Sequence, residues 1–215
     1  MTLWTSLVDL LREAMFAYAQ ATHGNFAAGI MAVTFLARLA LLPVSVRLAR
    51  AAAAHQAAMR RVQPELDAVR VKFKDDPGRL AEETRRVFAR AGIAVVPMAG
   101  CVGALLQAPV MLALFSAVRQ CAAIGGRFLW IRDISRPDAA VALVVAGLTA
   151  ASAAAGPPPE AAAQNRLLMI GVPAVFAAIA LWQMAAGVGL YWGVSSAVGV
   201  AQGVILRRQL ARRAA

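Results

Sequence analysis

The chain has 215 residues, of which 60% are hydrophobic and 15% are charged, and its formal net charge is +11. A soluble domain normally carries about a quarter charged residues, and the apolar residues here form long runs, so the composition excludes an ordinary soluble domain and is typical of a membrane protein. The basic residues lie at the ends of these runs and in one connecting segment, a distribution that indicates membrane topology rather than specific binding to nucleic acid.

Residues 1–24 predict an N-terminal amphipathic helix that lies in the membrane interface. Apolar side chains recur at helical spacing on one face of this segment, namely Leu3, Trp4, Leu7, Val8, Leu11, Met15 and Tyr18. The alternative that the pattern leaves open is a poorly ordered tail.

Four apolar runs follow, and they predict five membrane-spanning helices. The first run, Phe26–Val46, is about 31 Å long as a helix, which matches a hydrocarbon core of about 30 Å. The second contains Pro97 and Pro109, which favour a delayed helix start and a kink. The third is short and rich in alanine. The fourth, 167–206, has no charged residue and is long enough for two spans that turn near Gly187 and Gly189.

The sequence therefore predicts an all-α membrane protein with five spans, a cytoplasmic helical hairpin and an interfacial helix. The predicted segments are 1–24 (interfacial helix), 25–47 (first span), 48–92 (cytoplasmic hairpin), 93–120 (second span), 121–138 (extracytoplasmic interfacial segment), 139–155 (third span), 156–166 (cytoplasmic loop), 167–186 (fourth span), 187–206 (fifth span) and 207–215 (basic cytoplasmic tail). With the N-terminus outside and the C-terminus in the cytoplasm, 16 lysines and arginines lie inside and 5 outside, which decides the orientation by the positive-inside rule.

The segment 48–92 predicts two helical arms joined by the turn DDPG at 75–78. Each arm carries a narrow stripe at helical spacing, so the arms are expected to pack as an antiparallel hairpin. The stripes are Val62, Leu66, Val69 and Phe73 on the first arm, and Leu80, Thr84, Val87 and Ala91 on the second.

Interleaved charges on the hairpin leave two interpretations open: a solvated surface that pairs with itself, and a docking arm for a partner with acidic patches. The residues predicted for docking are Arg60, Arg61, Glu65, Lys72, Asp75, Asp76 and Arg79.

Arg38 lies inside the first apolar run, where an arginine costs roughly 2.5–3.5 kcal/mol on insertion scales. None of the five predicted spans contains Asp or Glu, so an acidic partner within the membrane is excluded. A guanidinium at this depth needs water, carbonyl oxygens or a visiting anionic group, which predicts a hydrated recess between the helices. The alternative is an arginine that extends to the inner interface. Gln107 is another polar side chain available to line the recess, and Trp192 lies either in the recess or in the interfacial aromatic belt.

Several stretches, taken in order, resemble the YidC family of membrane-protein insertases. They are RLALLPVSVR (38–47), QPELDAVRVKFKDDPGRLAEET (63–84), GCVGALLQAPVMLALFSAVR (100–119), FLWIRDISRPD (128–138) and GLYWGVSSAVGVAQ (189–202). The resemblance extends over residues 25–206. Within the family, the chain resembles a short, Gram-positive-type member or a divergent paralogue.

This resemblance implies an insertase and chaperone in the bacterial plasma membrane that performs no covalent chemistry and needs no cofactor. It implies a hydrophilic groove, open to the cytoplasm and to lipid, in which a fixed positive charge attracts the polar segment of an incoming protein. The groove residues that it implies are Arg38, Gln107, Ser152, Trp192 and Ser196.

The implied partners are nascent membrane proteins and membrane lipids, with the hairpin meeting the ribosome, the targeting machinery or the Sec translocon. The chain departs from the family pattern at three positions. Ser152 or a neighbouring alanine replaces a groove glutamine, Ala185 replaces a proline, and Ser196 replaces an asparagine.

The alternative function is a small organic-anion transporter with Arg38 as its binding charge, which predicts inverted repeats that the sequence does not show. A purely structural scaffold would leave Arg38 unexplained. The sequence shows no nucleotide-binding glycine loop, metal cluster or nucleophile triad, so we predict no catalytic residue, no metal and no cofactor.

Overall fold

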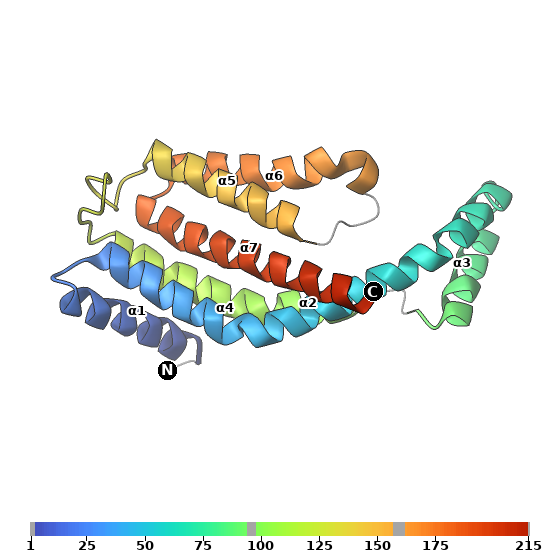
Figure 1. Cartoon of the computed structure of the whole chain (residues 1–215), viewed down its shortest axis with the longest axis horizontal. Coiled ribbons are helices and arrows are strands. Elements are labelled where there is room, and N and C mark those ends of the chain that lie inside the picture. The colour runs from blue at the N-terminus through green and yellow to red at the C-terminus, as the bar shows by residue number, and fades with distance from the viewer. Residues whose placement is uncertain (1–2, 94–97, 157–161, 215) are drawn as a thin grey trace. The chain divides into compact units, whose positions relative to one another are not determined.

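The structure is a computed structural model that describes residues 3–93, 98–156 and 162–214. Within these ranges, side chains are described except at residues 3, 98–107, 162–166, 210, 213 and 214. The described residues form helices and no strand (Figure 1). In chain order these are α1 (Leu3–Ala21), α2 (Phe26–Lys72), α3 (Pro77–Ala91), α4 (Met98–Ala122), α5 (Ala139–Ala155), α6 (Ala162–Gln183) and α7 (Ala186–Ala214). The prediction of an all-α chain is confirmed.

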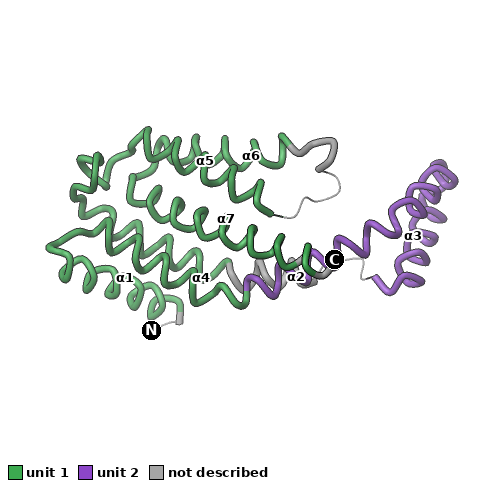
Figure 2. Tube along the Cα trace, in the orientation of Figure 1, with its two compact units in different colours: residues 1–44, 106–215 green, residues 45–105 purple. Residues whose placement is uncertain are grey.

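The chain divides into two compact units, which are described separately (Figure 2). Unit 1 contains residues 1–44 and 106–215, and unit 2 contains residues 45–105. Within unit 1, α7 lies between the α5–α6 pair and the group formed by α1, α4 and the start of α2 (Figure 1). The largest fully buried side chains of its core are Met15, Ile30, Thr34, Leu114, Val118, Cys121 and Ile134.

The apolar face of α1 packs against the core of unit 1. Val8 and Met15 are buried in this core, and a Cβ atom at Gly29 of α2 would lie 2.5 Å from the carbonyl oxygen of Met15. Only part of the predicted apolar face contributes to this core, because Trp4 and Tyr18 remain exposed. The location of α1 in the membrane interface stays a prediction.

α7 packs against α5 along a row of glycines. A Cβ at Gly189 would meet the side chain of Val141, and one at Gly203 would lie 2.8 Å from Ala155. Between these two contacts, a Cβ at Gly199 would collide with Oγ of Ser152. Small residues allow two helices to approach closely, which is a common packing mode in membrane proteins.

The turn between α6 and α7 lies at residues 184–185, two residues before Gly187 and close to its expected place. Gly187 and Gly189 themselves lie in α7, where they allow close contacts with other helices. A Cβ at Gly187 would lie 2.6 Å from Cβ of Ala122.

Three further helix bounds differ from the predicted segments. α2 continues through the predicted boundary at 47–48, since residues 48–62 are rich in alanine and contain neither proline nor glycine. α6 begins at Ala162, inside the predicted cytoplasmic loop, and α7 continues through the predicted tail to Ala214. α5 covers the same residues as the predicted third span.

Two described helices are long and apolar enough to cross a membrane, Phe26–Lys72 and Ala186–Gln209. Three shorter apolar helices accompany them, Ala108–Ala122, Ala139–Ala155 and Leu167–Gln183. α6 also exposes a face made of large apolar side chains, namely Leu168, Val172, Val175, Phe176, Ile179 and Trp182. These features are consistent with an α-helical membrane protein, and the number of spans stays a prediction.

Unit 2 pairs the C-terminal part of α2 with α3. Val62 and Leu66 of α2 form a buried cluster with Val87 and Phe88 of α3. The apolar stripe predicted for the second arm included Ala91, and this was wrong, since Ala91 is exposed. Phe88, about one turn earlier in α3, makes the apolar contact instead.

The turn between the two arms is built by local capping. Asp76 caps the N-terminus of α3 by accepting a hydrogen bond from the backbone N–H of Arg79 at 3.0 Å, which satisfies one of the donors left free at a helix start. α3 ends at Gly92, whose φ of 63° is in the left-handed region that favours glycine. Glu65 and Arg90 form an ion pair between the arms at 3.0 Å.

Candidate functional site

A cavity of about 570 Å³ lies in unit 1 around the side chain of Arg38. Residues of α2, α4, α5 and α7 form its wall. The lining residues are Arg38, Met111, Leu112, Phe115, Ser152, Tyr191, Trp192, Ser195, Ser196 and Gly199.

The guanidinium of Arg38 is held toward α7. Its Nε donates a hydrogen bond to Oγ of Ser195 at 3.1 Å. None of the lining residues is acidic, so the positive charge has no carboxylate partner in the described part of the cavity. Within a weakly polar wall, such a charge attracts anionic groups more strongly than it would in water.

Side chains of α7 also contact α4, α5 and α6 around this cavity. Oγ of Ser196 lies 3.2 Å from Oγ1 of Thr149 on α5. The ring of Trp192 lies 6.2 Å from that of Phe176 on α6. The hydroxyl of Tyr191 donates to the backbone oxygen of Met111 at 3.5 Å, which ties α7 to α4.

Thr34 lies one helical turn before Arg38 on α2. Its side chain is fully buried, and its Oγ1 atom has no hydrogen-bond partner among the described residues. A buried hydroxyl of this kind normally bonds to protein or to an ordered water.

The structure brings together four of the five residues that were predicted for the groove. Arg38, Ser152, Trp192 and Ser196 all line this one cavity, although they come from three helices far apart in sequence. Gln107 lies outside the residues whose side chains are described. Sequence reasoning missed the α4 wall at Met111, Leu112 and Phe115 as well as Gly199. Their common signal was only a helical repeat of apolar or small residues, which is equally typical of ordinary packing.

A comparison with known families matches residues 17–213 to the family described as 60Kd inner membrane protein. The chain belongs to that family. The match covers more than half of the sequence and includes every helix that lines the cavity, and it confirms the resemblance to YidC noted from the sequence.

Individual relatives of the chain are consistent with this family assignment. The chain is 30% identical over 200 residues to membrane protein insertase YidC 1 of Halalkalibacterium halodurans, covering 90% of this chain and 75% of the relative. It is 28% identical over 214 residues to membrane protein insertase YidC of Aliivibrio salmonicida, covering 98% of this chain and 38% of the relative. The corresponding protein of Vibrio cholerae is 28% identical over 194 residues, with 88% of this chain and 35% of the relative covered. The chain thus spans little more than a third of the two longer relatives. Membership of this family supports location in the bacterial inner membrane.

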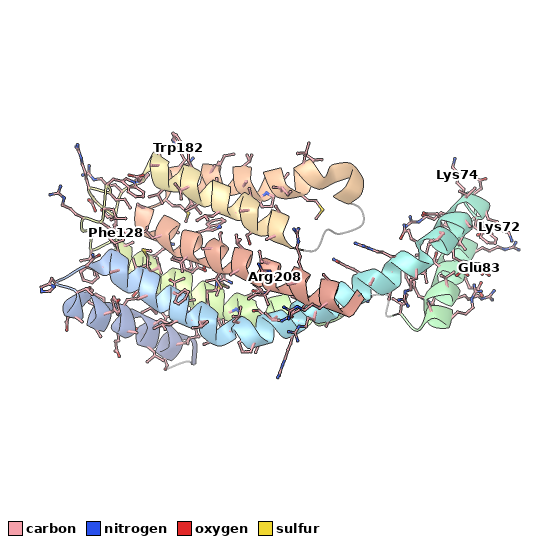
Figure 3. The ribbon with its side chains drawn as sticks, in the orientation of Figure 1. Lys72, Lys74, Glu83, Phe128, Trp182 and Arg208 are labelled. Atoms are coloured by element: carbon pink, nitrogen blue, oxygen red, sulfur yellow. The ribbon has the colours of Figure 1, made fainter. Side chains whose placement is uncertain are left out.

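The hairpin residues that were predicted to dock a partner are all exposed. Several also take part in contacts within unit 2. Glu65 pairs with Arg90, Asp76 caps α3 and pairs with Arg79 at 3.4 Å, and Nζ of Lys72 lies 5.3 Å from the ring centre of Phe73. Figure 3 shows Lys72, Lys74 and Glu83 on the surface of this unit. Exposed ion pairs contribute little stability and leave the charges accessible, so both interpretations of this surface remain open and the docking role stays a prediction.

Proposed function

We propose that this chain is a membrane-protein insertase and chaperone. Its cavity around Arg38 admits a polar segment of an incoming protein, and the substrate's apolar helix passes to lipid. The single observation that carries the proposal is an arginine on an apolar helix, half-buried beside a cavity of about 570 Å³ whose described lining holds no carboxylate.

The cavity reduces the cost of moving a polar segment into the membrane. At about 30 Å³ per molecule, a space of this size holds on the order of twenty waters. A segment that enters it keeps part of its hydration over the distance where lipid would otherwise remove it. The hydroxyl of Thr34, which has no hydrogen-bond partner among the described residues, supports this view, because it is a buried group that water would satisfy.

Arg38 supplies a fixed charge for acidic segments. Ser195 orients the guanidinium without neutralising it, so the remaining N–H donors stay available to a carboxylate of the substrate. Attraction at this site needs to be transient, because a tightly held segment would not be released. The neutral serine satisfies that requirement better than an acidic partner would.

The apolar helices supply the release route. α6 exposes a broad apolar face, and burial of the substrate's own apolar surface in lipid provides the driving force, at about 25 cal/mol per Å². The further partners proposed for this function are nascent membrane proteins as substrates, together with the ribosome, the targeting machinery or the Sec translocon at the exposed charges of unit 2.

The proposed membrane arrangement has five spans, formed by the apolar part of α2 and by α4, α5, α6 and α7. The proposed orientation places the N-terminus outside and the α2–α3 pair in the cytoplasm, as the distribution of basic residues favours.

Reconstituted vesicles test the proposal directly. We expect the native chain to insert a single-span protein with a short acidic outside tail, and Arg38→Ala to lose most of this activity while remaining folded. Arg38→Lys keeps the charge and is expected to retain part of the activity. Arg47→Ala removes an exposed arginine of the same helix and serves as the matched control.

Two results would contradict the proposal. One is normal insertion of the acidic-tailed substrate by Arg38→Ala, which would remove the role of the charge. The other is saturable uptake of a small organic anion into vesicles without any protein insertion, which would favour the transporter alternative instead.

A further inference from the structure

The segment that joins α4 to α5 contains a tight turn, closed by Phe128 and Ile131, with two large apolar side chains at its tip. The backbone N–H of Phe128 donates to the oxygen of Ile131 at 2.9 Å, and the N–H of Ile131 donates to the oxygen of Phe128 at 2.8 Å. Between them, Leu129 is 77% exposed and Trp130 is 58% exposed. Leu129 has a φ of 51°, a backbone conformation that is costly for a branched side chain. The turn therefore presents apolar groups outward at a local energetic cost.

The base of this turn is fixed to unit 1. Ile131 and Ile134 are buried in the core. The backbone N–H of Gly187 donates to the oxygen of Ile134, and the N–H of Ala186 donates to the oxygen of Arg136, each at 2.9 Å. The exposure of the tip is consequently a property of a structured segment that is hydrogen-bonded to the start of α7.

Basic residues flank the tip in the sequence. Arg127, Arg132 and Arg136 are all exposed. Neither Arg127 nor Arg132 has a hydrogen bond or ion pair within the described part of the chain, whereas Arg136 lies 3.7 Å from a carboxylate oxygen of Asp133.

The two acidic residues of the segment are engaged elsewhere. Asp133 accepts hydrogen bonds from the backbone N–H and the hydroxyl of Ser135, at 2.9 and 2.7 Å. Asp138 caps α5 by accepting from the N–H of Val141 at 2.9 Å. The charge presented around Leu129 and Trp130 is therefore mainly positive.

We propose that this turn docks on anionic phospholipid in the leaflet at its end of unit 1. Leu129 and Trp130 enter the boundary between headgroups and acyl chains, and Arg127 and Arg132 bind phosphate oxygens. An apolar tip beside guanidinium groups that have no ion-pair partner in the described part of the chain matches the chemistry of that boundary, where tryptophan is enriched and basic side chains are attracted to anionic headgroups.

Docking at this point would set the depth of the Arg38 site in the membrane. Ala186, which is hydrogen-bonded to the segment, precedes Ser195 by nine residues in α7. At 1.5 Å per residue this is about 14 Å along the helix, close to half of a hydrocarbon core of about 30 Å. Figure 3 shows Phe128 and Trp182 at the same end of unit 1, with Arg208 toward the other end.

The test uses the fluorescence of Trp130 in nanodiscs. The full chain carries four tryptophans, and replacing Trp4, Trp182 and Trp192 with Phe leaves Trp130 as the single probe. We expect phospholipids brominated near the headgroup end of the acyl chain to quench it more strongly than lipids brominated deeper, and aqueous acrylamide to quench it weakly. If the single-tryptophan variant does not reconstitute, the difference between the native chain and Trp130→Phe gives the same information.

The role of the arginines is tested by lipid preference. In phosphatidylcholine nanodiscs with a minor fraction of brominated phosphatidylglycerol, we expect Trp130 quenching to indicate local enrichment of the anionic lipid. Enrichment should fall by about fivefold for each arginine removed in Arg127→Ala and Arg132→Ala. The matched control is the double variant Arg208→Ala with Arg212→Ala, which removes two exposed charges from the other end of α7.

Strong acrylamide quenching with no bromolipid quenching would overturn the proposal and would favour a protein partner for this tip. Equal quenching by phosphatidylglycerol and phosphatidylcholine in the native chain would overturn the role of the arginines. The proposal needs the chain to span a membrane but not to insert proteins. A chain that lacks insertion activity and still shows shallow, anionic-lipid quenching would therefore separate the two proposals.

Discussion

Arg38 on α2 and Ser195 on α7 are joined by a hydrogen bond of 3.1 Å between Nε and Oγ, although 157 residues separate them in the sequence. The bond links the charge of the cavity to a helix that also contacts α4 and α5. Because the partner is a neutral hydroxyl, the arginine is oriented while its charge is preserved. The first prediction depends on this pair.

Replacing Ser195 with Ala should weaken the proposed insertion activity without preventing folding. A hydrogen bond to a charged group contributes about 1.5–3 kcal/mol, and water replaces part of it, so we expect insertion of acidic-tailed substrates to slow by about three- to tenfold. Ser195→Thr keeps the hydroxyl and should remain near the native rate. The measurement is the initial insertion rate in proteoliposomes. Ser116→Ala is the control, since Ser116 does not line this cavity, and an unchanged rate in Ser195→Ala would argue against the pair.

Replacing Gly199 with Ala should destabilise unit 1, and replacing Ser152 with Ala should relieve this effect. The new Cβ would collide with Oγ of Ser152, whereas Cβ of Ser152 lies at an ordinary 3.5 Å. Overpacking of this kind costs about 1–3 kcal/mol, so the double variant should be more stable than Gly199→Ala alone. Thermal unfolding in detergent measures the cycle. Gly171→Ala on α6 has no atom within 4 Å of its added Cβ and is expected to be neutral or stabilising.

Replacing Arg207 with Ala should loosen the end of α5. The guanidinium of Arg207 donates from Nη2 to the backbone oxygens of Ala154 and Gly156, and from Nε to that of Gly156 at 3.3 Å. It therefore satisfies carbonyl groups that a helix end leaves free and places a positive charge at the negative end of the helix dipole. We expect a loss of about 1 kcal/mol, seen as faster hydrogen exchange in the last turn of α5.

The neighbouring Arg208 is the matched control for that experiment. It is exposed, and its substitution with Ala removes the same charge from the same helix without touching α5. Equal exchange rates at the end of α5 in Arg207→Ala and Arg208→Ala would show that the contact has no stabilising role.

The stability of the segment 126–138 should depend on pH in the acid range. Hydrogen bonds from the hydroxyl and the backbone N–H of Ser135 lower the pKa of Asp133 below its ordinary value of 3.8. A carboxyl whose pKa is lowered by folding stabilises the folded form above its ordinary pKa, and this contribution is lost as the pH falls through the lowered pKa.

We therefore expect the isoleucine methyl NMR signals of Ile131 and Ile134 to stay constant from neutral pH to about pH 4 and to broaden or shift below it. Asp133→Asn should abolish this acid dependence, and Ser135→Ala should move it to higher pH. A profile that is the same in Asp133→Asn as in the native chain would assign the transition to another group.

Several features of the fold and the site were accessible from the sequence. Long apolar runs and the DDPG turn at 75–78 indicate helices and a break between two arms by composition alone. A charged residue within an apolar segment is also visible in the sequence, because residue type and neighbours along the chain are read without coordinates. Arg38 was therefore identifiable, and the structure places it beside a cavity with Ser152, Trp192 and Ser196.

Other features were not accessible because they depend on contacts between distant segments. Glycines at 187 and 189 are read locally as turn residues, yet they allow α7 to approach Ala122 and Val141. The choice of Phe88 rather than Ala91 for the α3 contact depends on the rotation of one helix against another. No local pattern specifies that rotation.

The sequence by itself determined the class of the protein and the position of its unusual charge. Hydrophobicity and charge are additive along a chain, so they can be read without coordinates. Only the tertiary structure decided that Ser195 orients Arg38 and that Leu129 and Trp130 project from a base hydrogen-bonded to α7. Such arrangements depend on which side chains meet across helices, and helix packing sets those contacts in three dimensions.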